Sequence, residues 1–93
     1  MVVKVRACVV FGGSVQGVFF RANTLRFAEA NSVSGWVRNT MDGRVEAVFE
    51  GEEEAVRATI ESCAKRQPLA RVDTSEIEYS AFTGELEGFR ITH

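Results

Sequence analysis

Histidine and cysteine are scarce in this sequence of 93 residues, which contains one histidine and two cysteines. The cysteines, Cys8 and Cys63, are far apart and form no Cys-x-x-Cys pair, and the histidine is the last residue, His93. A structural zinc site takes about four nitrogen or sulfur ligands, so the chain does not supply one. It also shows no cluster of carboxylates that would bind another metal. We therefore expect neither a metal nor a cofactor.

Long hydrophobic runs are absent as well. Residues 1–6 interleave Lys4 and Arg6 with apolar side chains, unlike the uncharged core of a signal peptide. Nowhere do about 18 uncharged apolar residues follow one another, as a membrane span requires. We expect a cytoplasmic protein that has no membrane partner and keeps both of its thiols reduced.

A strong excess of one charge is the third absence. The chain has 11 lysines and arginines against 13 aspartates and glutamates, for a formal net charge of −2. A general nucleic-acid binder is usually strongly basic, so we expect no nucleic-acid partner. Hydrophobic residues make up 45% of the chain and charged residues 26%, which is typical of a folded globular protein. This length predicts a single domain over residues 1–93.

Hydrophobic periodicity divides the chain into strands and helices. Alternating apolar and polar residues predict strands, and apolar residues three or four positions apart predict helices. The predicted elements are a strand over residues 3–11, a helix over 19–30, strands over 34–39 and 44–50, a helix over 52–66, a strand over 72–79 and a short strand over 89–91. Asp42-Gly43 is typical of a hairpin turn, and we expect the first strand to stop at Gly12-Gly13-Ser14.

The order of these elements predicts an α+β fold. It is the ferredoxin-like βαββαβ arrangement, a sandwich of two helices on one face of an antiparallel sheet, with a short extra strand at the carboxyl end. Cys8 then falls on the open face of the sheet and Cys63 on the buried side of the second helix, so the two thiols cannot form a disulfide. Because this fold hosts enzymes, metallochaperones, regulatory modules and RNA binders, it leaves the function open.

The turn between the first strand and the first helix is the most informative segment. It reads Gly13-Ser14-Val15-Gln16-Gly17-Val18-Phe19-Phe20-Arg21. A glycine-bearing loop that leads into a helix can direct several backbone N–H groups at one point, where the helix dipole adds positive potential. Arg21 could complete such a phosphate site, since its guanidinium matches phosphate oxygens. The alternative is an ordinary tight turn with an exposed arginine.

Asn39, at the end of a predicted strand, is the second candidate for a functional role. Its alternative is a turn-forming residue whose side chain bonds to its own backbone, and Asp42 is expected to be such a turn residue. His93 could act as a general base or could be a mobile tail. The sequence holds no obvious Ser-His-Asp or Cys-His set for nucleophilic catalysis.

Two motifs together resemble the signature pair of the acylphosphatase family. The first is the segment 13–21 quoted above. The second is Gly35-Trp36-Val37-Arg38-Asn39, followed by Asp42-Gly43-Arg44-Val45-Glu46. Their order and spacing match the family, and the resemblance continues to the closing segment 88–91. Departures at Gln67-Pro68, at residues 31–33 and at Ser75 concern turns and packing and leave both motifs whole.

The resemblance implies an enzyme that hydrolyses small acyl phosphates to a carboxylate and inorganic phosphate without a metal. It implies that Arg21 binds the phosphoryl group and that Asn39 holds the attacking water. The backbone N–H groups that would cradle the phosphoryl oxygens belong to Ser14, Val15, Gln16, Gly17, Val18 and Phe19. Inorganic phosphate would be both product and inhibitor. Nothing in the sequence signals oligomerisation, so a monomer is the default expectation.

Four other classes of protein are alternatives to this enzyme. A regulatory module would not need an arginine and an asparagine that converge on a glycine loop. An RNA-recognition domain would carry aromatic residues on the open sheet face, and the first and third predicted strands offer none. A metallochaperone would have paired cysteines in its first loop. The amino-terminal domain of a larger carbamoyl-transferring protein would be followed by a zinc-finger-like segment; we expect instead a protein of these 93 residues.

Overall fold

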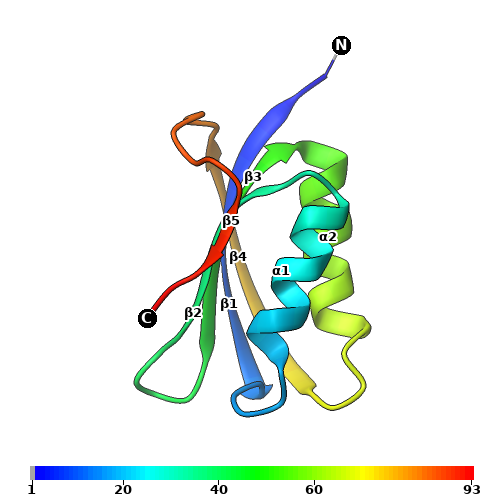
Figure 1. Ribbon diagram of the computed structural model, residues 1–93, viewed down its shortest axis with the longest axis vertical. Coiled ribbons are helices and arrows are strands. Elements are labelled where there is room, and N and C mark those ends of the chain that lie inside the picture. The colour runs from blue at the N-terminus through cyan, green and yellow to red at the C-terminus, as the bar shows by residue number, and fades with distance from the viewer. Residues whose placement is uncertain (1) are drawn as a thin grey trace.

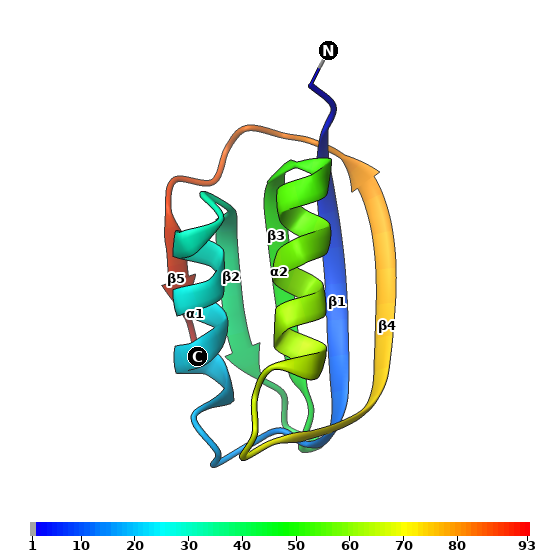
Figure 2. The same ribbon diagram turned by 90° about the vertical axis from the view of Figure 1, so that its right-hand side faces the viewer.

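The computed structural model describes residues 2–93, which form a five-stranded sheet and two helices (Figure 1). The elements are β1 (Lys4–Ser14), α1 (Phe20–Ala30), β2 (Ser34–Asn39), β3 (Val45–Glu52), α2 (Glu53–Lys65), β4 (Arg71–Ala81) and β5 (Phe89–Ile91). Both helices cover the same face of the sheet (Figure 2). The predicted ferredoxin-like fold is confirmed, since order, element type and layering all agree. Neither helix is both long and apolar enough to cross a membrane.

The sheet has the strand order β4-β1-β3-β2-β5. All its pairs are antiparallel except β2 with β5, which run parallel, so the extra strand makes the sheet mixed. The chain therefore has to cross from one edge of the sheet to the other between β4 and β5. Figure 2 shows this crossing by residues 82–88, after which β5 descends beside β2. The last residues of the chain consequently head toward the end of the sheet where β2 finishes.

β1 is longer than the alternating pattern over residues 3–11 indicates, because Gly12, Gly13 and Ser14, where that pattern stops, still belong to the strand. The strand continues to Ser14, which pairs with Arg71 of β4 after a register shift between the two glycines. Gly13 has a φ of 128°, and a Cβ built there would lie 2.1 Å from the carbonyl oxygen of Arg71. Glycine therefore marks a bulge and a close approach of two backbones, which local sequence alone does not distinguish from a strand end.

The core lies between the sheet and the two helices. Its buried side chains include Ala7, Val9 and Phe11 of β1, Val45, Ala47 and Phe49 of β3, Phe20, Thr24 and Ala28 of α1, and Val56, Ile60 and Cys63 of α2. Phe89 of β5 stacks on Phe49 with ring centroids 5.6 Å apart. Both cysteines are free thiols, and burial raises the pKa of Cys63 to about 12. The predicted position of Cys63 on the buried side of the second helix is thus confirmed.

Glu50 is a buried acid on the open face of the sheet, 1% exposed, and it holds the crossing segment in place. Its carboxylate accepts hydrogen bonds from the N–H and the hydroxyl of Thr83, at 3.0 and 2.8 Å, and from the N–H of Gly84 at 3.2 Å. Arg6 pairs with it at 3.1 Å. Burial alone would raise the pKa of Glu50, but the bonds from Thr83, Arg6 and Gly84 outweigh burial and hold it below its ordinary value.

Replacing Glu50 with glutamine should destabilise the protein by about 1–3 kcal/mol near neutral pH, because hydrogen bonds to a buried charge are lost. The pKa of Glu50 is depressed in the folded state, so its contribution is present above the ordinary value of 4.5 and is lost as the pH falls through the folded value. Urea unfolding at several pH values measures this difference. The matched control is Glu46→Gln, whose exposed partner Arg38 makes a loss below about 1 kcal/mol the expectation. A Glu50→Gln difference that stays constant from neutral to strongly acidic pH would contradict the assignment.

Candidate active site

A pocket of about 440 Å³ lies where β1 and β2 end and α1 begins. It is lined by Val15, Gly17, Phe19, Phe20, Arg21, Ala22, Asn39, Ile91 and His93. The pocket therefore brings together Arg21 and Asn39, the two side chains that the sequence singles out. A second pocket of about 440 Å³ lies beside Glu50 and contains neither of them.

The loop over residues 15–19 forms one wall of this pocket. Val15 is 1% exposed, so its side chain fixes the start of the loop in the core. Gly17 and Phe19 have φ values of 74° and 61°, in the left-handed region. Backbone that alternates between right- and left-handed conformations can direct successive N–H groups at one anion. No side chain caps the start of α1, and its first turn carries no acid, so this helix end is open to an anion.

Three of the six predicted cradle residues line the pocket. Val15, Gly17 and Phe19 line it, whereas Ser14, Gln16 and Val18 are absent from its lining. Ser14 lies within β1, opposite Arg71 of β4.

Arg21 is half-buried in the first turn of α1 and carries an uncompensated charge. Within residues 2–93 no carboxylate forms an ion pair with its guanidinium. The same part of the chain holds no group of three or more histidine, cysteine, aspartate or glutamate side chains that could bind a metal. The positive charge at the pocket therefore comes from Arg21 and from the helix end.

Asn39 is the last residue of β2, and its amide oxygen Oδ1 is buried without a hydrogen-bond partner. A buried polar atom without a partner costs about 1–3 kcal/mol, and a bound water or ligand is the usual explanation. In the alternative interpretation, the Asn39 side chain forms the turn by bonding to its own backbone. This oxygen makes no such bond, and Thr40 and Arg44 close the turn instead. Within residues 2–93 this oxygen is thus left without a partner, and its residue lines the pocket.

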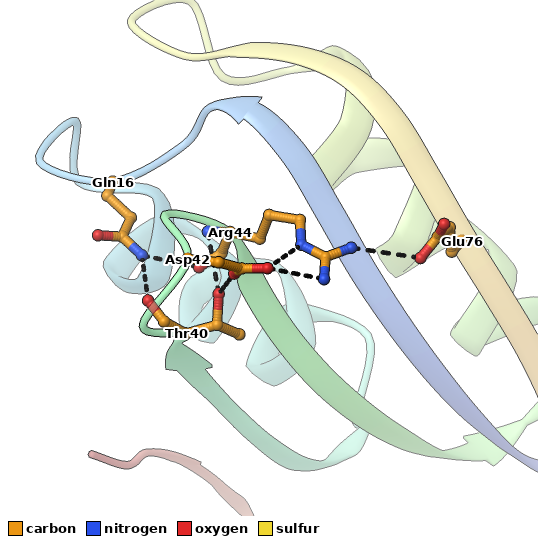
Figure 3. A network of polar contacts seen from close by, with 5 residues as sticks. All are labelled: Gln16, Thr40, Asp42, Arg44 and Glu76. Atoms are coloured by element: carbon orange, nitrogen blue, oxygen red, sulfur yellow. Dashed lines mark hydrogen bonds and ion pairs between the residues drawn. The ribbon is translucent and has the colours of Figure 1, made fainter.

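Thr40, Asp42 and Arg44 close the turn between β2 and β3 (Figure 3). The Thr40 N–H donates to the Arg44 carbonyl at 2.8 Å, and the Arg44 N–H donates to the Thr40 hydroxyl oxygen at 3.0 Å. Asp42 accepts a hydrogen bond from the Thr40 hydroxyl and pairs with the Arg44 guanidinium at 2.8 Å. The bonds from Arg44, and then that from Thr40, lower the pKa of Asp42 to about 2. Asp42 is thus the turn residue that the sequence predicts.

Gln16 connects this turn to the loop after β1. Its side-chain Nε2 donates to the carbonyl oxygen of Thr40 at 2.9 Å and to that of Arg44 at 2.8 Å (Figure 3). The loop that leads to Arg21 is thereby attached to the turn that follows Asn39. The sequence suggested only a backbone role for Gln16, because nothing in its local pattern shows which distant carbonyls its side chain meets.

Ile91 and His93 also line the pocket. The sequence indicated no role for Ile91 and left His93 as either a general base or a mobile tail. Their position follows from the parallel register of β5 with β2, in which Ile91 lies opposite Val37 and the chain continues beside Asn39. Periodicity cannot reveal the partner or the direction of a three-residue strand. A terminal histidine therefore looks like a tail in the sequence and lies at the pocket in the fold.

Known proteins resemble this chain in sequence and in fold. The family model described as Acylphosphatase matches residues 7–91. A relative named Acylphosphatase from Pelotomaculum thermopropionicum is 46% identical over 88 residues, which is 95% of this chain and 96% of that protein. The crystal structure of acylphosphatase from Bacillus subtilis has a TM-score of 0.91 and 30% identity, covering 96% of this chain and 99% of that one. T. kodakarensis HypF is 35% identical with a TM-score of 0.78, but the match covers only 12% of that chain.

Replacing Gln16 with alanine should lower the free energy of unfolding by about 1–2 kcal/mol, because two hydrogen bonds are lost. It should also speed hydrogen exchange of the Thr40 amide more than that of amides in β1 and β4, since the turn alone loses its support. Gln16→Glu is the matched variant: its side chain has the same shape but, when ionised, cannot donate to a carbonyl. Wild-type stability and turn protection in Gln16→Glu would show that the two bonds do not hold the turn.

Proposed function

The chain belongs to the acylphosphatase family, and from this membership we propose how its pocket carries out the reaction. The protein is an acylphosphatase, a hydrolase that splits acyl phosphates into a carboxylate and inorganic phosphate. The observation that carries the proposed residue roles is the placement of Arg21 and Asn39 in one pocket.

The phosphoryl group binds between the start of α1 and Arg21. The uncapped helix end and the left-handed backbone at Gly17 and Phe19 support this position, because they favour N–H groups directed at an anion. In this proposal the N–H groups of residues 14–19 cradle the phosphoryl oxygens. The Arg21 guanidinium adds charge-assisted hydrogen bonds to the same oxygens, in a geometry that matches its planar fork.

Asn39 orients the attacking water through its amide oxygen. An amide cannot remove a proton, so its contribution is to position the water in line with the bond that breaks. The water oxygen bonds to phosphorus, the bond from phosphorus to the acyl oxygen breaks with its electron pair going to the carboxylate, and a phosphoryl oxygen takes the water proton. Phosphoryl transfer has a loose transition state, in which positioning and charge stabilisation carry most of the catalysis.

The reaction needs no metal ion in this proposal. A carboxylate is a good leaving group, which lessens the need for a Lewis acid. Arg21 and the helix end provide positive charge at the phosphoryl position, and the mechanism uses no other cation.

We further propose that the enzyme acts as a cytoplasmic monomer without nucleic-acid or membrane partners. Arg21 and Asn39, the two side chains with proposed roles, both line the pocket without a second copy of the chain, and both cysteines are free thiols. The net charge of −2 also disfavours general binding to nucleic acids. Trp36 is an aromatic residue of β2 on the open face of the sheet, but the guanidinium of Arg38 lies over its ring at 5.6 Å.

Alanine variants should separate the roles of Arg21 and Asn39. Arg21→Ala should weaken inhibition by phosphate and also lower kcat, because charged contacts to the phosphoryl group strengthen as charge develops. Asn39→Ala should lower kcat on the order of 10²-fold, the loss found for one oriented hydrogen bond, while phosphate inhibition stays near wild type. Steady-state kinetics with phosphate as inhibitor measure both effects. Normal turnover by Asn39→Ala, or a loss of phosphate inhibition as large as that in Arg21→Ala, would contradict the water-positioning role.

Hydrolysis should be unchanged after treatment with EDTA and removal of divalent cations. Arg21 and the helix end supply the positive charge that a metal would otherwise bring, so neither kcat nor KM should shift by more than experimental error. An absorbance assay of benzoyl phosphate hydrolysis, with Mg²⁺ added back as the control, tests this. Activity that disappears with EDTA and returns with Mg²⁺ would overturn the metal-free mechanism.

A further inference from the structure

We propose that Phe19 and Ile91 form an acyl-group site that selects acyl phosphates with apolar or aromatic acyl groups. The inference rests on the proposed function, since it assumes that the phosphoryl group of the substrate binds beside Arg21. It concerns the part of the same pocket that the phosphoryl group does not fill.

The pocket is larger than a phosphoryl group needs. Its volume is about 440 Å³, whereas four oxygens of about the size of water occupy on the order of 100 Å³ at ~30 Å³ each. Pockets of ~300–1,000 Å³ hold small organic ligands. The acyl carbon of an acyl phosphate is joined to phosphorus through one oxygen, so the acyl group has to lie next to the phosphoryl group. The space beyond the phosphoryl group is therefore where it would bind.

The walls of that space are mainly apolar. Five lining residues have apolar side chains, namely Val15, Phe19, Phe20, Ala22 and Ile91. Val15 and Phe20 are 1% and 2% exposed and belong to the core, but Phe19 is 72% exposed and Ile91 is 37% exposed. Two large apolar side chains from opposite ends of the sequence thus meet at one pocket with free surface. Covering this surface with an apolar acyl group would remove it from water, which is favourable.

The backbone of Phe19 gives a second reason to assign its ring to a ligand. Its φ is 61° and its ψ is 21°, a conformation that costs an L-residue about 1–2 kcal/mol and that glycine adopts without strain. A bulky residue there is an outlier of the kind found at ligand sites. The ring is not buried in the core, so core packing does not offset this strain. Contact with the substrate is a role that the exposed ring can fill.

The two side chains differ in how they reach the pocket. Phe19 directly precedes α1 and lies two residues before Arg21, so its position depends on the loop that forms the phosphate site. Ile91 lies in β5 opposite Val37 of β2, so its position depends on the sheet. A distortion of the loop would affect Phe19 alone, and a distortion of the sheet would affect Ile91 alone. If both variants bind the acyl group more weakly, the shared cause is therefore the loss of an apolar contact.

The test compares benzoyl phosphate with acetyl phosphate, which share the phosphoryl group and differ in the acyl group. Wild type, Phe19→Ala and Ile91→Ala are assayed with both substrates at one fixed pH. The measured quantity is the ratio of kcat/KM for benzoyl phosphate to that for acetyl phosphate, divided by the wild-type ratio, so that the intrinsic reactivities cancel. Phe19→Ala retains the Cβ and its left-handed backbone, so it removes the ring alone.

We expect this normalised ratio to fall about tenfold in each variant, the discrimination that a modest apolar contact provides, mainly through a higher KM for benzoyl phosphate. Met41→Ala is the control, because Met41 is fully exposed on the turn between β2 and β3 and does not line the pocket. Its normalised ratio should stay within about twofold of one.

An unchanged ratio in both pocket variants would overturn the acyl-group site, and so would equal losses of kcat/KM for the two substrates. Inhibition by inorganic phosphate, measured in the same variants, shows whether the phosphate site is intact. If wild type hydrolysed neither substrate, the proposed function itself would fail, an outcome distinct from the failure of the acyl-group site.

Discussion

The side-chain amide of Gln16 joins the two segments on which the proposed chemistry depends. β1 and β2 are not neighbours in the sheet, because β3 lies between them. Both are antiparallel to β3, so they end at the same end of the sheet but with a strand's width separating them. The two hydrogen bonds from Gln16 to the turn before β3 cross that gap. They fix the distance between the loop that leads to Arg21 and the strand end that carries Asn39.

The two arginines near the pocket differ in whether an acidic side chain neutralises them. Arg44 is close in sequence to Asn39, but it is bound to Asp42 and lies 3.5 Å from Glu76 of β4, so its charge serves the turn. Arg21, in contrast, has no acidic partner within residues 2–93. An incoming anion therefore meets one uncompensated guanidinium together with an uncapped helix end. The neutralised arginine keeps the turn rigid, and the unpaired one is left for the substrate.

The sequence predicts what depends on local pattern, and it misses what depends on distant partners. Alternating and helical periodicities predict the elements, and the two motifs predict that Arg21 and Asn39 belong to one site. The extension of β1 through Gly13 is missed because it requires the neighbouring strand β4. The burial of Glu50 and the position of Ile91 are missed for the same reason, since each is decided by the path of the chain after β4.

The crossing segment from β4 to β5 leads into the strand that carries Ile91 to the pocket, and it is held at both of its ends. Glu50 fixes its beginning at Thr83 and Gly84, and the pairing of β5 with β2 fixes its end. Side chains on a strand alternate between the two faces of a sheet, so a shift of one residue in the pairing of β5 with β2 would turn Phe89 and Ile91 outward and Arg90 inward. Such a shift would remove a wall of a pocket at the opposite end of the molecule, without changing any residue that lines it.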